Sequence, residues 1–301
     1  MGPDVAFVEG TVSVSVPATS ANLGPGYDCL GIALELADTL VAEVADGLEV
    51  HVAGEGAGEL PLDERHLVIR SMLATFAAMD VSPPGLHLSC TNRIPHSRGL
   101  GSSSAAIIGG IVLARSLVQG GAEAFDDAAA LSLASLIEGH PDNVAPALLG
   151  GFVISGQTGD EVWAQQSPVD PSISAVVFVP PNGVHTAVAR GLLPATVSHA
   201  DATANTGRAA LLVAALGGHP QQLWRATEDF LHQQQRLPAM PESLALVAEL
   251  RGRRVPAVVS GAGPTVLAFV TDDAEAVTAL APAGWRVLRQ GVGGHGAAVL
   301  M

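Results

Sequence analysis

The stretch from Pro95 to Ala106, which reads Pro-His-Ser-Arg-Gly-Leu-Gly-Ser-Ser-Ser-Ala-Ala, restricts the possible folds of this chain more than any other feature. Apolar residues alternate with other residues just before it, at 86–90, and an unbroken run of small and apolar residues follows it at 107–113. This pattern predicts a strand, then a loop rich in glycine and serine, then a helix. The glycines at 99 and 101 permit backbone torsions and close approaches that side chains forbid.

Three serines, Ser102 to Ser104, fall where the helix would begin. Their hydroxyls and the free N–H groups of the first turn can face one anion, which indicates a phosphate-binding loop. Two better-known loops do not fit, because a Walker A loop requires lysine and all 14 basic residues of this chain are arginine. A dinucleotide fingerprint has a third glycine where Ser104 stands. For the loop alone, a simple connector with a helix N-cap stays an open alternative.

Composition narrows the class of protein. The 301 residues suffice for one large domain or two ordinary ones, and the net charge of −15 argues against nucleic acid and anionic membranes as partners. No uninterrupted apolar segment is long enough to span a membrane, and the first residues lack the signs of a signal peptide or a myristoylation site. Two isolated cysteines, Cys29 and Cys90, are too few for a disulfide framework, so we expect a cytoplasmic location.

Periodicity predicts an α+β fold with two mixed sheets and helices packed on them. A strand at 11–16 should end at Pro17, and the Gly- and Pro-rich segment 18–31 should be irregular. In the rest of the first half we expect strands at about 32–36, 39–45, 47–53, 86–90, 152–155 and 161–165, and helices at about 63–79, 103–118, 126–137 and up to 149. In the second half we expect strands at about 173–179, 255–260, 264–270, 285–290 and 296–300, and helices at about 186–192, 199–216, 220–232, 241–251 and 273–280. A change of composition at 157–172 predicts domains of residues 1–168 and 169–301.

Glu138 stands at the C-terminal end of a predicted helix, where the macrodipole disfavours a negative charge by about 0.3–1 kcal/mol. Because stability would not select a carboxylate there, the position hints at function. A carboxylate, a serine hydroxyl and phosphate oxygens are the usual ligands of Mg²⁺. The alternatives are that Glu138 points into solvent and that the following His140-Pro141-Asp142 is a simple turn.

Further polar candidates lie in or near the Gly-rich stretches. Asn22 and Asp28 belong to the first stretch, where their alternative role is turn chemistry. Thr186 and Arg190 are one helical turn apart and share a face, and Arg236 follows a run of glutamines. An arginine fork can clamp a carboxylate or phosphate, although a solvated surface arginine is the alternative. An acidic protein that binds anions must concentrate its few arginines or use a divalent cation.

Together these stretches resemble the motifs of the GHMP kinases, and within them those of the homoserine kinase family. Residues 17–28 are similar to the first motif, 94–105 to the ATP loop, 138–146 to a hallmark of homoserine kinases, and 260–265 to the third motif. The four matches follow the order of the family, which is far more specific than a lone Gly-rich loop. Mevalonate kinases of the superfamily use a lysine in the first motif, and its absence here disfavours that branch.

The resemblance implies a two-domain GHMP kinase fold. Its N-terminal domain is like the second domain of ribosomal protein S5, and its C-terminal domain is ferredoxin-like. It also implies that ATP lies against the loop formed by Pro95, His96, Ser97, Arg98, Gly99, Leu100, Gly101, Ser102, Ser103, Ser104 and Ala105. Ser102 and Glu138 would hold Mg²⁺.

By the same resemblance, the substrate homoserine would contact Asn22, Asp28, His140, Arg190 and Arg236. Asp28 could pair with the amine of the substrate and the two arginines could clamp its carboxylate. Thr186 would lie close to the transferred group, so that Ser102, Glu138, Thr186 and Arg190 are the candidate catalytic residues. No general base is assigned, because phosphoryl transfer depends mainly on positioning and charge neutralisation.

The sequence therefore predicts a kinase that transfers the γ-phosphate of Mg-ATP to the side-chain hydroxyl of L-homoserine. The products would be O-phospho-L-homoserine and ADP, a step of threonine biosynthesis. The resemblance also suggests a homodimer. Two alternatives stay open, a GHMP-type kinase for another small alcohol and a non-catalytic homologue that binds a ligand or partner.

Overall fold

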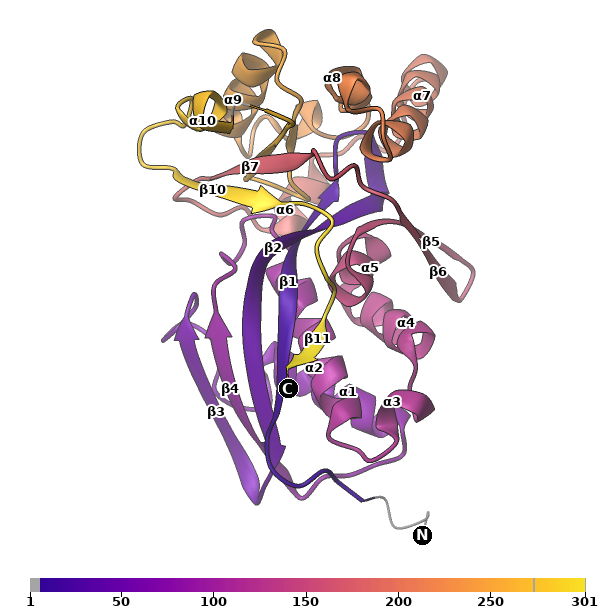
Figure 1. Cartoon of the computed structure of the whole chain (residues 1–301), viewed down its shortest axis with the longest axis vertical. Coiled ribbons are helices and arrows are strands. Elements are labelled where there is room, and N and C mark those ends of the chain that lie inside the picture. The colour runs from indigo at the N-terminus through magenta and orange to yellow at the C-terminus, as the bar shows by residue number, and fades with distance from the viewer. Residues whose placement is uncertain (1–5, 273, 301) are drawn as a thin grey trace.

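A computed structural model describes residues 6–272 and 274–300 and has an α+β fold built on two sheets (Figure 1). Within these residues the larger sheet contains seven strands: β1 (Val12–Asn22), β2 (Gly26–Val44), β3 (Gly47–Gly54), β4 (Gly85–Asn92), β5 (Phe152–Thr158), β6 (Glu161–Ser167) and β11 (Ala298–Leu300). The order is β11-β1-β2-β4-β3, with β5 paired to β2 and to β6. This sheet is mixed, as predicted, because β3 runs parallel to β4 and the other pairs are antiparallel.

The helices of the first half cover one face of this sheet (Figure 1). They are α1 (Leu67–Ala78), α2 (Ser102–Ser116), α3 (Gly121–Ala124), α4 (Asp127–Glu138) and α5 (Pro141–Leu149). The predicted run 107–113 lies in α2 and is wholly buried, so α2 forms the centre of the core. α4 begins where the Asp126 side chain accepts a bond from the N–H of Ala129, and it ends at Gly139, whose φ is 92°. The helix positions predicted for this half are confirmed.

The second sheet is the base of the C-terminal half. Among the described residues it contains β7 (Ser174–Val179), β8 (Ala257–Val259), β9 (Val266–Val270) and β10 (Arg286–Gly291) in the order β10-β7-β9-β8. All three pairings are antiparallel, so the prediction of a mixed sheet is wrong here. The helices of this half are α6 (Thr186–Gly191), α7 (His199–Leu216), α8 (Leu223–Ala226), α9 (Pro241–Gly252) and α10 (Ala274–Thr278). The succession β-α-β-β-α-β is that of a ferredoxin-like domain, as the resemblance implied.

The prediction for residues 17–31 is also wrong, because they are largely strand. β1 continues through Pro17, and β2 begins at Gly26 and runs for 19 residues without a break. Pairing survives because the register shifts just after Pro17 and just before Asn22, which absorbs the proline and the tight turn that follows.

A predicted helix at 220–232 is shorter in the structure. A 3-10 turn, η1 (Pro220–Gln222), leads into α8, and the chain then leaves the helix. The Asp229 carboxylate explains the end, because it accepts hydrogen bonds from the backbone N–H groups of Leu231, His232 and Gln233. A second 3-10 turn, η2 (Gln234–Arg236), follows at once. The side chain thus competes with the helix for backbone donors.

The C-terminal segment returns to the first half of the chain. In Figure 1 it runs from β10 down to β11, which pairs with β1 and places Ser13 opposite Leu300. Backbone bonds from Gly293 to Ala33 and from Ala297 to Ala147 fix the path between them. The division of the chain near residue 168 stays a prediction.

The three Gly-rich stretches of the sequence meet in space. Gly99 has a φ of 73°, and a Cβ built on it would lie 2.2 Å from the carbonyl oxygen of Ser260 and 2.9 Å from that of Gly263. The Ser260 hydroxyl donates to the Gly99 carbonyl oxygen at 2.6 Å and lies 2.8 Å from the Ser20 hydroxyl. Gly101, with a φ of 69°, passes so close to the first stretch that its Cβ would lie 1.9 Å from the Thr19 Oγ1. The absence of a side chain at Gly99 and Gly101 therefore lets the three stretches pack against one another.

Within the two described ranges, none of the helices combines the length and apolarity needed to cross a bilayer. The predicted absence of a leader concerns the start of the chain, and residues 1–5 lie outside the described residues.

Replacing Gly99 with alanine should lower the free energy of unfolding well beyond the cost of its left-handed φ. Gly120 is a matched control, because its φ is 70° and a Cβ there would meet nothing within 4 Å. We expect Gly120→Ala to cost about 1–2 kcal/mol and Gly99→Ala at least about 2 kcal/mol more, since the Cβ would collide with backbone atoms. Urea denaturation of the three proteins measures the difference. Equal losses in the two variants would show that the close approach at Gly99 is unimportant.

Candidate functional site

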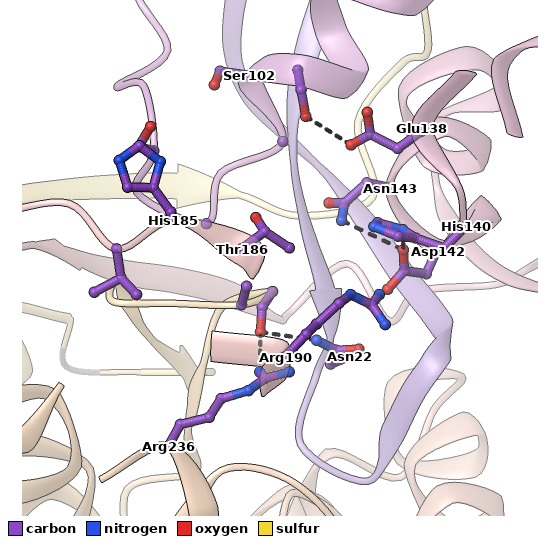
Figure 2. Close-up of a pocket in the computed structure, with 17 residues that line it drawn as sticks. Asn22, Ser102, Glu138, His140, Asp142, Asn143, His185, Thr186, Arg190 and Arg236 are labelled. Carbon is purple, nitrogen blue, oxygen red and sulfur yellow. Dashed lines mark hydrogen bonds and ion pairs between the residues drawn. The ribbon is translucent and has the colours of Figure 1, made fainter. Parts of the chain in front are cut away.

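A cavity of about 330 Å³ opens where the three Gly-rich stretches meet. It is lined by Asn22, Ser97, Gly99, Gly101, Ser102, Ser103, Glu138, His140, Asp142, Asn143, Val184, His185, Thr186, Arg190, Arg236, Gly261 and Ala262. Figure 2 shows Ser102 and Glu138 at one end and Arg236 at the other, with Thr186 and Arg190 between them. One wall is therefore made of serine hydroxyls and a carboxylate, and the opposite wall carries two guanidinium groups.

Glu138 is bound by two serines of the loop. Its Oε1 accepts hydrogen bonds from the hydroxyls of Ser103, at 2.7 Å, and Ser104, at 2.9 Å. Ser102, which we had paired with Glu138, lines the same wall without such a bond to it in the structure. The carboxylate lies at the end of α4, where the dipole disfavours it, but also at the start of α2, where the dipole favours it. This placement resolves the electrostatic conflict that the sequence suggested.

Arg190 is already paired in this structure. Its guanidinium forms two bonds to the Asp28 carboxylate, at 2.6 and 3.0 Å, and a third to the Tyr27 hydroxyl at 2.9 Å. The hydrogen bonds to Asp28, despite some burial, raise the pKa of Arg190, as expected for a guanidinium with two bonds to one carboxylate. Two residues predicted to bind opposite ends of a substrate therefore bind each other here. Asp28 itself lies behind Arg190 rather than on the cavity wall.

Arg236 is the most unusual cation of the site. Its side chain is 1% exposed, and its Nη1 donates to the Gly261 carbonyl oxygen at 2.9 Å. Across residues 6–272 and 274–300 it forms no ion pair, and its Nε has no hydrogen-bond partner. Burial accordingly lowers the pKa of Arg236. A buried, unpaired guanidinium costs stability, and it lines the cavity, so it is suited to receive an anion.

A hydrogen-bonded chain forms another part of the wall. His140 Nδ1 donates to the Asp142 Oδ1 at 2.5 Å, and the Asp142 side chain is almost wholly buried. The Thr19 hydroxyl donates to the Asn143 Oδ1 at 2.8 Å, and the Asn143 amide lies beside Asp142. Burial alone would lower the pKa of His140, but the bond to Asp142 and the nearby charges leave the pKa raised.

Backbone strain is concentrated in the residues around the cavity. Asn22, Asp28 and Ser97 have φ values of 67°, 56° and 54°, a region that non-glycine residues rarely occupy. The Asn22 side chain stabilises the turn, since its Oδ1 accepts from the N–H of Asp28 and its Nδ2 donates to the Gly261 oxygen. Such strain persists only where surrounding contacts enforce it, and it is frequent at functional sites.

A second, smaller cavity of about 200 Å³ lies on the other side of the loop and shares Ser97, Ser102 and Ser103 with the first. Its remaining lining is mostly apolar and includes the buried ring of His66, whose two nitrogens have no hydrogen-bond partner among the described residues. Burial lowers the pKa of His66, so the ring is neutral. This cavity can take a flat, largely apolar group attached to an anion at the loop.

The structure brings most predicted site residues together. Asn22, Ser102, Glu138, His140, Thr186, Arg190 and Arg236 line the main cavity, and five loop residues (His96, Ser97, Ser102, Ser103 and Ala105) line the second. Pro95, Leu100 and Ser104 are buried and line neither cavity. Arg98 donates to the carbonyl oxygens of His96, Pro180 and Pro181, so its guanidinium is used to hold the loop.

Sequence reasoning missed six residues of the main cavity: Asp142, Asn143, Val184, His185, Gly261 and Ala262. Four of them lie inside the motif stretches 138–146 and 260–265, where each could be explained as a turn residue. Val184 and His185 directly precede the predicted helix at 186–192, and no local pattern marked them.

Comparison with known proteins identifies the family. The GHMP kinases N terminal domain family matches residues 66–151. A homoserine kinase from Streptomyces coelicolor is 56% identical over 297 residues, which cover 98% of this chain and 96% of that protein. The chain belongs to the homoserine kinase family. A second relative, a homoserine kinase from Clavibacter michiganensis, is 52% identical over 89% of this chain and 85% of its own length.

A solved structure agrees with this assignment. The crystal structure of homoserine kinase from Cytophaga hutchinsonii has a TM-score of 0.85 to this chain at 26% identity, and the match covers 98% of this chain and 99% of that one. The family and the two-domain GHMP kinase fold that the motifs predicted are thus confirmed. An enzyme of the homoserine kinase family uses ATP, so the main cavity is the candidate active site of a kinase.

Replacing Asp142 with asparagine should lower the pKa of His140 and make the protein less stable in a pH-dependent way. A histidine with a raised folded pKa adds stability below its ordinary value of 6.5, and this stability is lost as the pH rises through the folded value. The variant should therefore lose more stability, relative to the parent, at pH 6 than at pH 9. Histidine NMR titration and urea denaturation at both pH values measure the two effects. An unchanged His140 titration would contradict the assignment.

Proposed function

We propose that this member of the family transfers the γ-phosphate of Mg-ATP to the side-chain hydroxyl of L-homoserine, producing O-phospho-L-homoserine and ADP. The observation that carries the proposal is the cavity with two unlike walls, one with the serine loop and Glu138 and the other with the buried, unpaired Arg236. The first wall suits phosphates, and the second suits the carboxylate of an amino acid. The identity to relatives named homoserine kinase supports the same substrate.

The wall formed by the serine loop and Glu138 offers oxygen ligands that suit a magnesium ion. No cluster of three or more His, Cys, Asp or Glu side chains occurs in the described part of the chain, so a bound cation would depend on Glu138, the Ser102 hydroxyl and phosphate oxygens. Two serines occupy Oε1 of Glu138, whose second oxygen is left for a cation. When bound, Mg²⁺ neutralises part of the charge that develops on the phosphates. Glu138 and Ser102 would hold the cation, and the N–H groups of the first turn of α2 would face the phosphates.

Homoserine would enter between the two walls. Arg236 needs an anion, and the α-carboxylate of the substrate would supply it. Asp28 does not line the cavity, so the predicted contact between its carboxylate and the ammonium group would require the Asp28–Arg190 pair to rearrange. Asn22 and His140 line the intervening wall, and Thr186 stands between it and the loop, near the proposed path of the phosphoryl group. The site would work mainly by positioning, without a dedicated general base.

The second cavity would take the base of ATP. It adjoins the phosphate loop, it is mostly apolar, and the neutral ring of His66 offers one donor and one acceptor to a base edge. This gives a role to a buried polar side chain that is otherwise unsatisfied.

We further propose that the protein acts in the cytoplasm as a homodimer. Cys29 and Cys90 are free thiols, which fits a reducing compartment. Burial raises the pKa of Cys29 to about 11 and that of Cys90 to about 12. The dimer rests on the resemblance to the family.

The proposed reaction is tested by coupled ADP release across a panel of acceptors. With Mg-ATP, we expect L-homoserine to give turnover well above mevalonate, shikimate and simple sugars, because only homoserine offers a carboxylate and an amine at the required spacing. Preference for another alcohol would indicate a different GHMP-type kinase. Failure to bind ATP would indicate a non-catalytic homologue.

Replacing Glu138 with alanine should reduce turnover by about a hundredfold or more with only a moderate loss of melting temperature. The variant loses two serine hydrogen bonds at the rim of the cavity, but it also relieves an unfavourable charge at the end of its own helix. Glu123→Ala is the control, since Glu123 is an exposed helical carboxylate away from the cavity. ADP release and thermal unfolding of both variants provide the comparison. A large loss of stability with full activity per folded molecule would overturn the functional role of Glu138.

A further inference from the structure

Tyr27 contacts Arg190 and Arg236, the two arginines on the cavity wall opposite the serine loop. It is the only tyrosine of the chain and follows the tight turn between β1 and β2. The Cζ atoms of Arg190 and Arg236 lie 5.6 and 5.9 Å from the centroid of its ring. Both distances are within the range at which the face of an aromatic ring attracts a cation. One ring therefore interacts with two guanidinium groups that come from different parts of the sequence.

The two arginines need such a partner because they repel each other. The charge of Arg190 lowers the pKa of Arg236, adding to the larger effect of burial. Arg190 has Asp28 as its counter-ion, whereas Arg236 has no ion pair among the described residues. The ring of Tyr27 supplies negative electrostatic potential without adding a full charge. A carboxylate in its place would satisfy Arg236 permanently and remove its capacity to bind an anion.

The ring of Tyr27 packs against the imidazole of His232. The two rings have centroids 5.2 Å apart and an interplanar angle of 38°. His232 is buried, and its Nε2 donates to the carbonyl oxygen of Gly24 at 2.8 Å, so it is anchored to the same turn that carries Tyr27. Burial lowers the pKa of His232, although the Asp229 carboxylate, whose Oδ1 lies 3.7 Å from Nε2, opposes this effect. Turn, imidazole and phenol form one rigid support.

The hydroxyl of Tyr27 has a separate task. It accepts a hydrogen bond from Arg190 Nη1 at 2.9 Å, and the same Nη1 also donates to Asp28. Burial and the charge of Asp28 raise the pKa of Tyr27, so the group stays a neutral phenol. The hydroxyl thus orients the guanidinium of Arg190, while the ring acts on both arginines.

We propose that Tyr27 is a positioning residue for a two-arginine clamp that binds the α-carboxylate of the substrate. Tyr27 is not part of the cavity lining, so it acts through Arg190 and Arg236 without touching the substrate. The carboxylate part of the proposal rests on the proposed function. The support of the arginines by Tyr27 does not, and it can be tested without any substrate.

Kinetics test the first part. Tyr27→Phe keeps the ring and removes the hydroxyl, and Tyr27→Leu removes both. We expect Tyr27→Leu to raise KM for L-homoserine about tenfold or more and Tyr27→Phe to raise it less, while KM for ATP stays nearly constant. A general structural defect would change both KM values. Equal KM values for homoserine in all three proteins would overturn the clamp, and an inactive parent protein would instead overturn the proposed function.

Arginine labelling tests the second part. Phenylglyoxal modification of the full chain, mapped by mass spectrometry, reports the reactivity of each arginine. In Tyr27→Leu we expect faster labelling of Arg190 and Arg236, and in Tyr27→Phe of Arg190 alone. Arg251, which packs on Trp224 away from the site, is the internal control and should not change.

The labelling outcome decides the proposal even if one variant fails. Unchanged rates at both site arginines would overturn it. If Tyr27→Leu does not fold, or if Arg251 also labels faster in it, the decision falls to Tyr27→Phe. In that variant a faster Arg190 beside a protected Arg236 supports the proposal, and the parent pattern contradicts it.

Discussion

The contact between two backbones, at Gly99 and at the turn 260–263, is the constraint on which the rest of the site depends. A Cβ at position 99 would lie 2.2 Å from the carbonyl oxygen of Ser260, and the Ser260 hydroxyl donates to the Gly99 carbonyl oxygen. Because these contacts bind the loop at 95–105 to the turn 260–263, the position of the loop depends on that of the C-terminal half. The first motif joins through Gly101 and the N–H of Thr19, which donates to Leu100. The three stretches are thus rich in glycine for one shared reason, which is that they pack closely against one another.

The junction of the three Gly-rich stretches also brings the charged side chains of the cavity together. The chain has a net charge of −15 and only 14 basic residues, yet two arginines converge on one cavity. One is held by Asp28 and the other is left without a counter-ion among the described residues. On the opposite wall, Glu138 is bound by serines at the start of α2. Each charged side chain of the site is therefore held by contacts that do not use all of its hydrogen-bonding positions.

Sequence reasoning was most successful where a signal is local. The apolar run at 107–113 and the helix at 126–137 were both recognised from neighbouring residues, and they lie in α2 and α4 of the structure. It failed at 17–31, because glycine and proline also occur in strands when a register shift absorbs them. Order and identity of motifs placed the candidate site, but the pairing of Asp28 with Arg190, 162 residues apart, depends on tertiary structure. Local patterns contain no information about such partners.

The return of the C-terminus to the first sheet bears on how this protein is made. Among the described elements β1 comes first in the chain and its partner β11 comes last, so the β1 edge of the large sheet stays unpaired until residues 298–300 have been made. The nascent first half can acquire its helices and most of its sheet while that edge is still available to other chains. That edge is covered only after residues 298–300 have been made. The two halves are then joined covalently at one end and by strand pairing at the other.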